Sequence, residues 1–152
     1  MQRNLVLSAA ILTMAGLSAL GWARAEQAPS DEERMKKLDA GPKPIDVSKY
    51  PVEQQKAYKL FGEKCSACHA VARGISSDMV LPGDWERYVK RMMHKPNSGI
   101  TSEEGKTLFG FLVYESSARK PDLLKKQLAE LPAAERTAAV EKIKSVNPSF
   151  VP

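Results

Sequence analysis

Two cysteines and a histidine lie within one short segment of the chain, and their spacing suits the attachment of a metal-bearing group. The segment reads Cys65-Ser66-Ala67-Cys68-His69. In a C-x-x-C-H pattern both thiols add to the vinyl groups of a porphyrin, and the imidazole that follows becomes the proximal ligand of the iron. The pattern therefore predicts one covalently attached haem c, held by Cys65, Cys68 and His69.

Two other kinds of site share the C-x-x-C part of this pattern, namely redox dithiols and zinc sites. A redox dithiol is expected beside alternating strands and helices, and the sequence shows no such alternation. A zinc site needs more ligands, but the chain has no further cysteine and only one other histidine, His94. Haem attachment is therefore the favoured interpretation.

The second axial ligand of such an iron has to come from elsewhere in the chain. The candidates after the motif are Met79, Met92, Met93 and His94. A helix advances by about 100° per residue, which places Met92 between Tyr88 and Val89 on an apolar face. Met93 is then rotated roughly a quarter turn away, and His94 points to the opposite side. Met92 is the preferred ligand, with Met93 and Met79 as alternatives.

The nature of the sixth position decides what the iron can do. A thioether opposite the histidine raises the reduction potential, and it blocks the access of small molecules to the metal. An open or water-filled position would instead suit a sensor or a peroxidase. Ordinary core packing is the competing interpretation of Met92, because methionine often fills gaps in a core.

The N-terminal residues have the pattern of a secretory signal. Arg3 precedes an apolar stretch from Leu5 to Leu20, and Ala23-Arg24-Ala25 is a small-x-small cleavage pattern. We expect residues 1–25 to be a signal peptide and the protein to be periplasmic. The alternative is an uncleaved anchor in the inner membrane, because the apolar stretch is nearly long enough to span a bilayer.

Length and charge exclude several classes of protein. The residues after position 25 are enough for a single domain. The formal net charge is +5, and loss of Arg3 and Arg24 with the signal would lower it to +3. A charge this small does not indicate a nucleic-acid-binding protein. Clustered carboxylates and nucleophile–base pairs are missing from the sequence, so we expect neither an enzyme nor a small-molecule substrate.

The mature chain divides into three segments. Residues 26–50 carry mixed charge and several prolines, and we expect them to form a leader or linker. Residues 51–118 are expected to form an all-α monohaem domain. Residues 119–152 have the pattern of a charged helical tail, with helices beginning near Pro121 and Pro132. This tail is either a clasp packed over the domain or an arm that docks a partner.

Three helices are predicted within the monohaem domain. The first runs from Val52 to Lys64 into the cysteine motif. After a loop over 72–83, the second begins near Asp84 as N-cap and ends near residue 95. The third begins at Thr101, which forms a capping box with Glu104.

The second predicted helix carries a basic side opposite its apolar face. This side consists of Arg87, Lys90, Arg91 and Lys95. It is either a solvated helix face or a docking patch for an acidic redox partner, whose encounter the charge would steer.

Three passages of the chain resemble the class I cytochrome c family, and in particular its small bacterial monohaem members. They are Ala57-x-x-x-Phe61-x-x-x-Cys65-Ser66-Ala67-Cys68-His69, Trp85-Glu86-Arg87-Tyr88-Val89-Lys90-Arg91-Met92, and Gly99 through Leu108-x-x-Phe111-Leu112. The second passage is similar to the W-x-x-x-V-x-R-M ligand helix of one bacterial subgroup. The resemblance covers about residues 52–114.

This resemblance implies an all-α fold in which helices wrap around one covalent haem, here with a C-terminal helical extension. It implies that Ala57 and Phe61 cross Phe111 where the terminal helices meet.

The resemblance also carries expectations for side chains around the haem. It implies that a proline carbonyl, for which Pro82 is the nearest candidate, orients the proximal imidazole. Arg73 and Trp85 are the candidates for hydrogen bonds to the haem propionates, and a surface salt bridge is the competing interpretation of Arg73.

The expected function is electron transfer, in which the haem iron cycles between Fe(III) and Fe(II) in the periplasm. The expected partners are redox proteins, acidic or membrane-bound. Two alternatives stay open: a cytochrome subunit of a periplasmic dehydrogenase complex, and a haem-based ligand sensor or peroxidase with an open sixth site.

Overall fold

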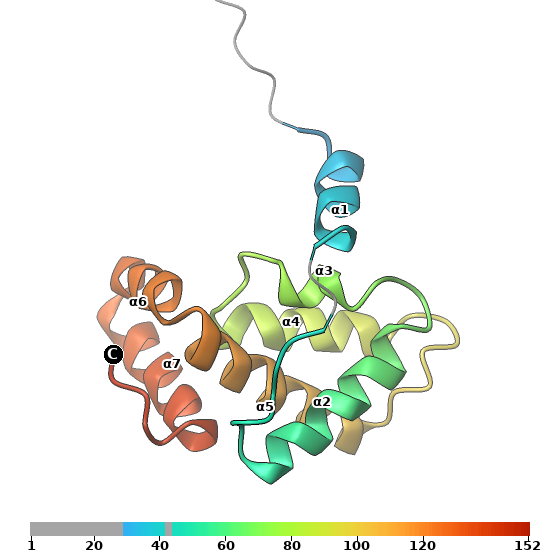
Figure 1. The fold of residues 1–152 in the computed structure, drawn as a ribbon. Helices are drawn as coiled ribbons and strands as arrows, with labels where there is room; N and C mark the ends of the chain where they lie inside the picture. The colour runs from blue at the N-terminus through green and yellow to red at the C-terminus, as the bar shows by residue number, and fades with distance from the viewer. Residues whose placement is uncertain (1–28, 42–43) are drawn as a thin grey trace, which may run out of the picture.

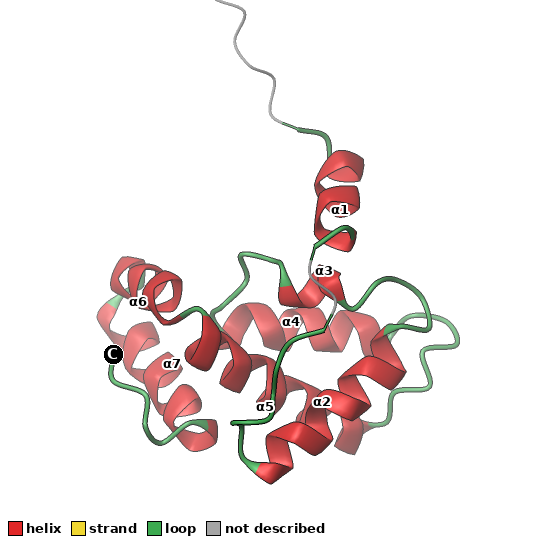
Figure 2. Cartoon of the chain, in the orientation of Figure 1, coloured by secondary structure: helices red, strands yellow, loops and turns green. Residues whose placement is uncertain are grey.

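The computed structural model describes residues 29–41 and 44–152, and these residues form helices and loops without strands (Figures 1 and 2). The predicted signal peptide over residues 1–25 lies outside the described ranges. The helices are α1 (Asp31–Asp39), α2 (Val52–Cys65), α3 (Ala72–Ile75), α4 (Pro82–Met93), α5 (Ser102–Arg119), α6 (Pro121–Glu130) and α7 (Ala133–Val146). The predicted all-α class is confirmed for this part of the chain.

The crossing of α2 with α5 forms the centre of the core. The rings of Phe61 and Phe111 lie 5.4 Å apart, centroid to centroid, and both side chains are almost fully buried. Ala57, one helical turn before Phe61, is 4% exposed, and its small side chain allows the two helices to approach closely. The predicted crossing of the two helices, with Phe61 against Phe111, is confirmed. Because α2 ends at Cys65, this crossing also fixes where the cysteine motif begins.

Helix α4 begins earlier than predicted. Its first residue is Pro82, and Leu81 rather than Asp84 is the N-cap. Proline suits the first turn because the amide that it lacks has no partner there. Asp84 instead lies inside the first turn and forms an ion pair with Arg87. The predicted N-cap was therefore wrong by one turn, although the helix itself is confirmed.

Helix α5 begins as predicted and extends further. The Thr101 side chain accepts a hydrogen bond from the amide of Glu104, whose carboxylate accepts one from the amide of Thr101. The helix then continues to Arg119 and brings Ser116 and Ser117 into the core. Because of this length, α5 contacts every other long helix of the domain (Figure 1).

The C-terminal segment packs against the rest of the domain. Its helices begin at Pro121 and just after Pro132, as predicted. Four of its apolar side chains are buried in the common core: Leu124, Leu128, Ile143 and Phe150. The side chain of Asn147 donates to the hydroxyl of Ser117 over 2.8 Å. Figure 1 shows α6 and α7 lying along one end of α5.

Two short helices lie where the sequence predicted a leader and a loop. Helix α1 begins with a capping box between Ser30 and Glu33, and α3 is a single turn after the cysteine motif. Helix α1 lies above α3, outside the main helical body (Figure 1). Within the ranges that the structure describes, the length and apolar character needed to cross a membrane occur together in no helix.

Candidate cofactor site

The cysteine motif occupies the turn that follows α2. Cys65 is the last residue of the helix and is buried, whereas Cys68 is exposed, and both are free thiols. The amide of Ser66 donates to the carbonyl of Gly62 and closes the helix. The chain then turns so that the two thiols and the imidazole of His69 all border one cavity.

This cavity has a volume of about 1260 Å³, which exceeds the roughly 300–1,000 Å³ of most small-molecule sites. Its walls come from α1, α2, α4 and the segments around α3. The side chains with possible roles at a haem include Cys65, Cys68, His69, Met79, Tyr88 and Met92. A largely apolar group bigger than an ordinary metabolite therefore suits this cavity.

His69 has a defined tautomer. Its Nδ1 lies 3.0 Å from the carbonyl oxygen of Ala70, and because a carbonyl only accepts, Nδ1 carries the proton. Nε2 then has a free lone pair, which is the form in which imidazole binds a metal. The acceptor is Ala70 and not Pro82, which is buried in the first turn of α4. The predicted role of the Pro82 carbonyl was therefore wrong.

The lone pair of His69 faces a phenol in this structure. The hydroxyl of Tyr88 lies 3.4 Å from Nε2. Tyr88 is 6% exposed, and burial raises the pKa of its hydroxyl to about 12. The phenol is therefore neutral and donates to Nε2 across this long contact.

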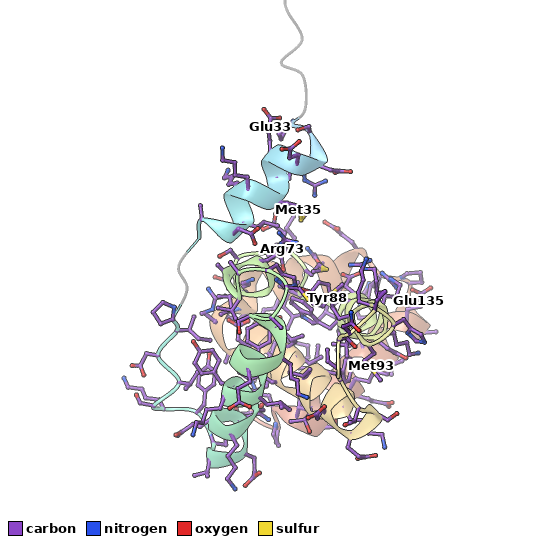
Figure 3. The ribbon with its side chains drawn as sticks, turned by 90° about the vertical axis from the view of Figure 1, so that its right-hand side faces the viewer. Glu33, Met35, Arg73, Tyr88, Met93 and Glu135 are labelled. Carbon is purple, nitrogen blue, oxygen red and sulfur yellow. The ribbon has the colours of Figure 1, made fainter. Side chains whose placement is uncertain are left out.

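The four candidate axial ligands fall into two groups. Met79 and Met92 border the cavity that contains the motif. Met93 does not: its sulfur packs on Gly105 of α5, so close that a Cβ at that position would lie 2.5 Å from it. His94 is exposed, and its Nδ1 lies 2.6 Å from the carbonyl of Lys90. Figure 3 shows Met93 farther from α1 than Arg73 and Tyr88.

The two residues expected at the propionates have different surroundings. Trp85 is fully buried, and its indole N–H donates to the hydroxyl of Ser116 over 2.9 Å. The prediction for Trp85 was therefore wrong, because its single donor is already used in the core. Arg73 borders the cavity and forms an ion pair with Asp39.

The basic side predicted on α4 is not uniform. Arg87 and Lys90 form ion pairs with carboxylates of the same helix. Arg91 and Lys95 instead border the cavity, and the guanidinium of Arg91 lies 5.5 Å from the centroid of the Tyr88 ring. Of these four cations, Arg91 and Lys95 are the two that border the cavity, where they could pair with a ligand that carries carboxylates.

The donor set fits a covalent haem. Two free thiols, an imidazole and the thioethers of Met35, Met79 and Met92 border one large cavity. Burial raises the pKa of the Cys65 thiol to about 11. Nowhere in the described ranges do three or more histidine, cysteine or carboxylate side chains gather as a metal cluster, so the structure adds no ligand to the C-x-x-C pair that would complete a zinc site.

Sequence reasoning missed the contribution of α1. Met35 and Leu38 border the same cavity, although residues 26–50 were predicted only to form a leader or linker. The signal was present as Ser30-x-x-Glu33, the same capping pattern that located α5. No protein-family model matches the chain, and neither does any curated protein or solved structure with which it was compared.

Proposed function

We propose that this protein is a periplasmic electron-transfer protein of the class I cytochrome c kind, with one haem c attached through Cys65 and Cys68. The observation that carries this proposal is that Cys65, Cys68 and His69 border a single large cavity together with Met92. When bound, the haem supplies an iron that accepts and releases one electron. The protein does no bond-making chemistry on a substrate.

The motif residues hold and orient the group. Cys65 and Cys68 fix the edge of the porphyrin from two points of one turn. His69 would bind the iron through Nε2, and its Nδ1–H donates to the carbonyl of Ala70. This hydrogen bond fixes the tautomer and the orientation of the ring, and it raises the basicity of Nε2.

Met92 is the proposed second ligand. It lies on α4, whose other residues at this level, Tyr88 and Arg91, border the same cavity. Met79 borders the cavity from the segment before α4 and is the alternative. Met93 is the weaker alternative, because its sulfur is packed against Gly105 on α5.

The remaining helices keep this geometry constant. The buried contact between Phe61 and Phe111 joins the helix that carries the motif to α5, and α5 packs against the ligand helix α4. A site built on packed helices changes little between oxidation states, which favours rapid electron transfer. The partner we propose is another redox protein, acidic at its contact surface, which would meet the cations Arg91 and Lys95 beside the cavity.

The experiment that tests this function is expression of the full chain in a bacterium with a c-type haem maturation system. The purified protein should carry one haem by mass, and it should show a reversible one-electron titration. The control is a Cys65→Ala/Cys68→Ala double variant, which should be exported without haem. Polypeptide of unmodified mass from the wild-type gene would contradict the proposal.

A second measurement separates the carrier from the sensor and peroxidase alternatives. Carbon monoxide is added to the reduced protein at neutral pH. A thioether on the sixth position should make binding slow and incomplete, whereas an open position binds rapidly and fully. Rapid, complete binding would assign the open-site function in place of electron transfer.

A further inference from the structure

We propose that α1 is a wall of the cofactor site that covers the bound porphyrin, so that the N-terminal segment takes part in setting the properties of the haem. This inference rests on the proposed function, since the haem is the group that α1 would cover. It is carried by the placement of α1 over the cavity and by two contacts that hold it there.

Helix α1 turns its few apolar side chains toward the cavity. Met35 and Leu38 are three residues apart and share one face of the helix, and both border the cavity with the cysteine motif. Figure 3 shows Met35 on the side of α1 that faces Arg73 and Tyr88. Yet no residue of α1 is buried. An apolar face that borders a cavity and stays partly exposed has its packing partner inside that cavity.

The first contact that holds α1 is an ion pair at its last residue. The guanidinium of Arg73 on α3 donates two hydrogen bonds to the carboxylate of Asp39, one of them 2.9 Å long from Nε to Oδ1. A two-point pair of this kind fixes orientation as well as distance. Because α3 directly follows the cysteine motif, α1 is joined to the segment that carries His69.

The second contact is a close approach just after the helix. A Cβ added to Gly41 would lie 2.3 Å from the hydroxyl oxygen of Ser76 and 3.2 Å from the carbonyl oxygen of Leu38. The glycine is therefore required for the chain to lie directly on the end of α3. The buried hydroxyl oxygen of Ser76 has no hydrogen-bond partner in the structure, which shows how tightly this backbone covers it.

The charges of α1 favour a porphyrin as the occupant. Arg34 and Lys37 border the cavity beside the two apolar side chains. Three of the four acidic residues of α1 lie in its first turn, where they suit the helix dipole. The fourth, Asp39, is paired with Arg73. A face that combines apolar side chains with cations complements a group with an apolar ring and two carboxylates.

Covering the haem has a measurable consequence. Exclusion of water disfavours the ferric form, which carries the extra positive charge, so that burial raises the reduction potential. Displacement of α1 should therefore lower the potential of the holoprotein. It should not release the haem, because the thioether bonds do not depend on α1.

The experiment compares hydrogen exchange of the α1 amides in the holoprotein and in the haem-free Cys65→Ala/Cys68→Ala protein, and it titrates the potential. We expect at least tenfold slower exchange in the holoprotein. Gly41→Val and, independently, Asp39→Ala should abolish this protection and shift the potential downward. The control is Lys36→Ala, on the exposed side of α1, which should leave both unchanged.

The outcomes distinguish this inference from the proposed function. Suppose that the wild-type protein carries haem. If the α1 amides then exchange equally fast in the holoprotein and the haem-free protein, or if Asp39→Ala leaves the potential unchanged, the proposed role of α1 is overturned and the proposed electron transfer is not. Wild-type protein that never acquires haem overturns the proposed function itself. Should Gly41→Val fail to fold, the Asp39→Ala protein still decides the question.

Discussion

The hydroxyl of Tyr88 lies 3.4 Å from Nε2 of His69, the nitrogen that would bind the iron. Since Nδ1 donates its proton to Ala70, the lone pair on Nε2 is the only acceptor that the imidazole offers to Tyr88. The same lone pair binds iron. Contact with Tyr88 and ligation of the metal therefore exclude each other, and Tyr88 holds the imidazole only in the haem-free protein.

The first prediction concerns Tyr88→Phe. The variant loses one hydrogen bond in the haem-free protein, which should lower the free energy of unfolding by about 1 kcal/mol. In the holoprotein the same change should be nearly neutral, because Nε2 is then occupied. Urea unfolding of both forms measures the difference.

Tyr58→Phe is the matched control for this prediction. The hydroxyl of Tyr58 accepts a hydrogen bond from the amide of Ile45 over 3.1 Å, and haem binding does not compete for that bond. Tyr58→Phe should therefore lower the free energy of unfolding equally in the haem-free protein and in the holoprotein. If Tyr88→Phe lowered the free energy of unfolding of the holoprotein as much as that of the haem-free protein, the contact with Tyr88 and ligation of the iron would not exclude each other.

The second prediction assigns the axial ligand. Met92→Ala should remove the sulfur-to-iron absorption band of the oxidised protein and lower the reduction potential, because the thioether stabilises ferrous iron. Met93→Ala is the control, since the sulfur of Met93 packs on Gly105 away from the motif. Optical spectra of the Met92→Ala and Met93→Ala holoproteins show which change removes the band. If the band survives in Met92→Ala and disappears in Met79→Ala, the ligand is Met79.

The third prediction concerns the two thiols of the haem-free protein made without maturation. Burial raises the pKa of Cys65 to about 11, so that at pH 8 roughly one molecule in a thousand carries its thiolate. Iodoacetamide should therefore alkylate the exposed Cys68 first. Labelling of Cys65 should rise about tenfold per pH unit up to pH ~11.

The same shift affects stability in a defined pH window. A thiol with a raised pKa stays protonated in the folded state, while the unfolded thiol ionises near its ordinary pKa of 9.0. The contribution of Cys65 to stability is thus fully present below pH 9 and is lost as the pH rises toward 11. Mass spectrometry of the alkylated peptides measures the labelling rates of the two cysteines. Equal rates for Cys65 and Cys68 at pH 8 would contradict the raised pKa of Cys65.

Local signals in the sequence predicted those parts of the fold that depend on neighbours along the chain. The capping box of Thr101 and Glu104 needs only four residues, and it located the start of α5. The period of a helix separated Met92 from Met93, and the structure places the two methionines at different cavities. The spacing of the cysteine motif required no tertiary information either.

Features that depend on distant contacts could not be predicted in the same way. Trp85 was expected at the cavity, but its indole N–H is bound by Ser116, which lies 31 residues later. Helix α1 was missed because Met35 and Leu38 are too few to give an apolar period. Their role becomes visible only when the cavity opposite them is known. Helix propensity without a packed face was not enough to predict this element.

The last prediction concerns the ion pair between the buried Glu115 and the partly exposed Arg119 at the end of α5. Glu115 is 1% exposed and pairs with Arg119, whose guanidinium also donates to the carbonyl of Ile75. These bonds tie the end of α5 to the segment that carries Ser76 and the cavity residue Met79. Glu115→Gln removes the negative charge that pairs with Arg119. Because water reaches part of the Arg119 side chain, this change should cost about 1–3 kcal/mol of stability.

Glu103→Gln is the matched control, because Glu103 pairs with Lys106 on the exposed surface of the same helix. A surface pair of this kind contributes little, so the denaturation midpoint of that variant should not change. Chemical denaturation of the three proteins gives the comparison. If Glu115→Gln were as stable as the control, α5 would hold the segment after α3 by apolar packing alone, and the ion pair would have no part in positioning Met79.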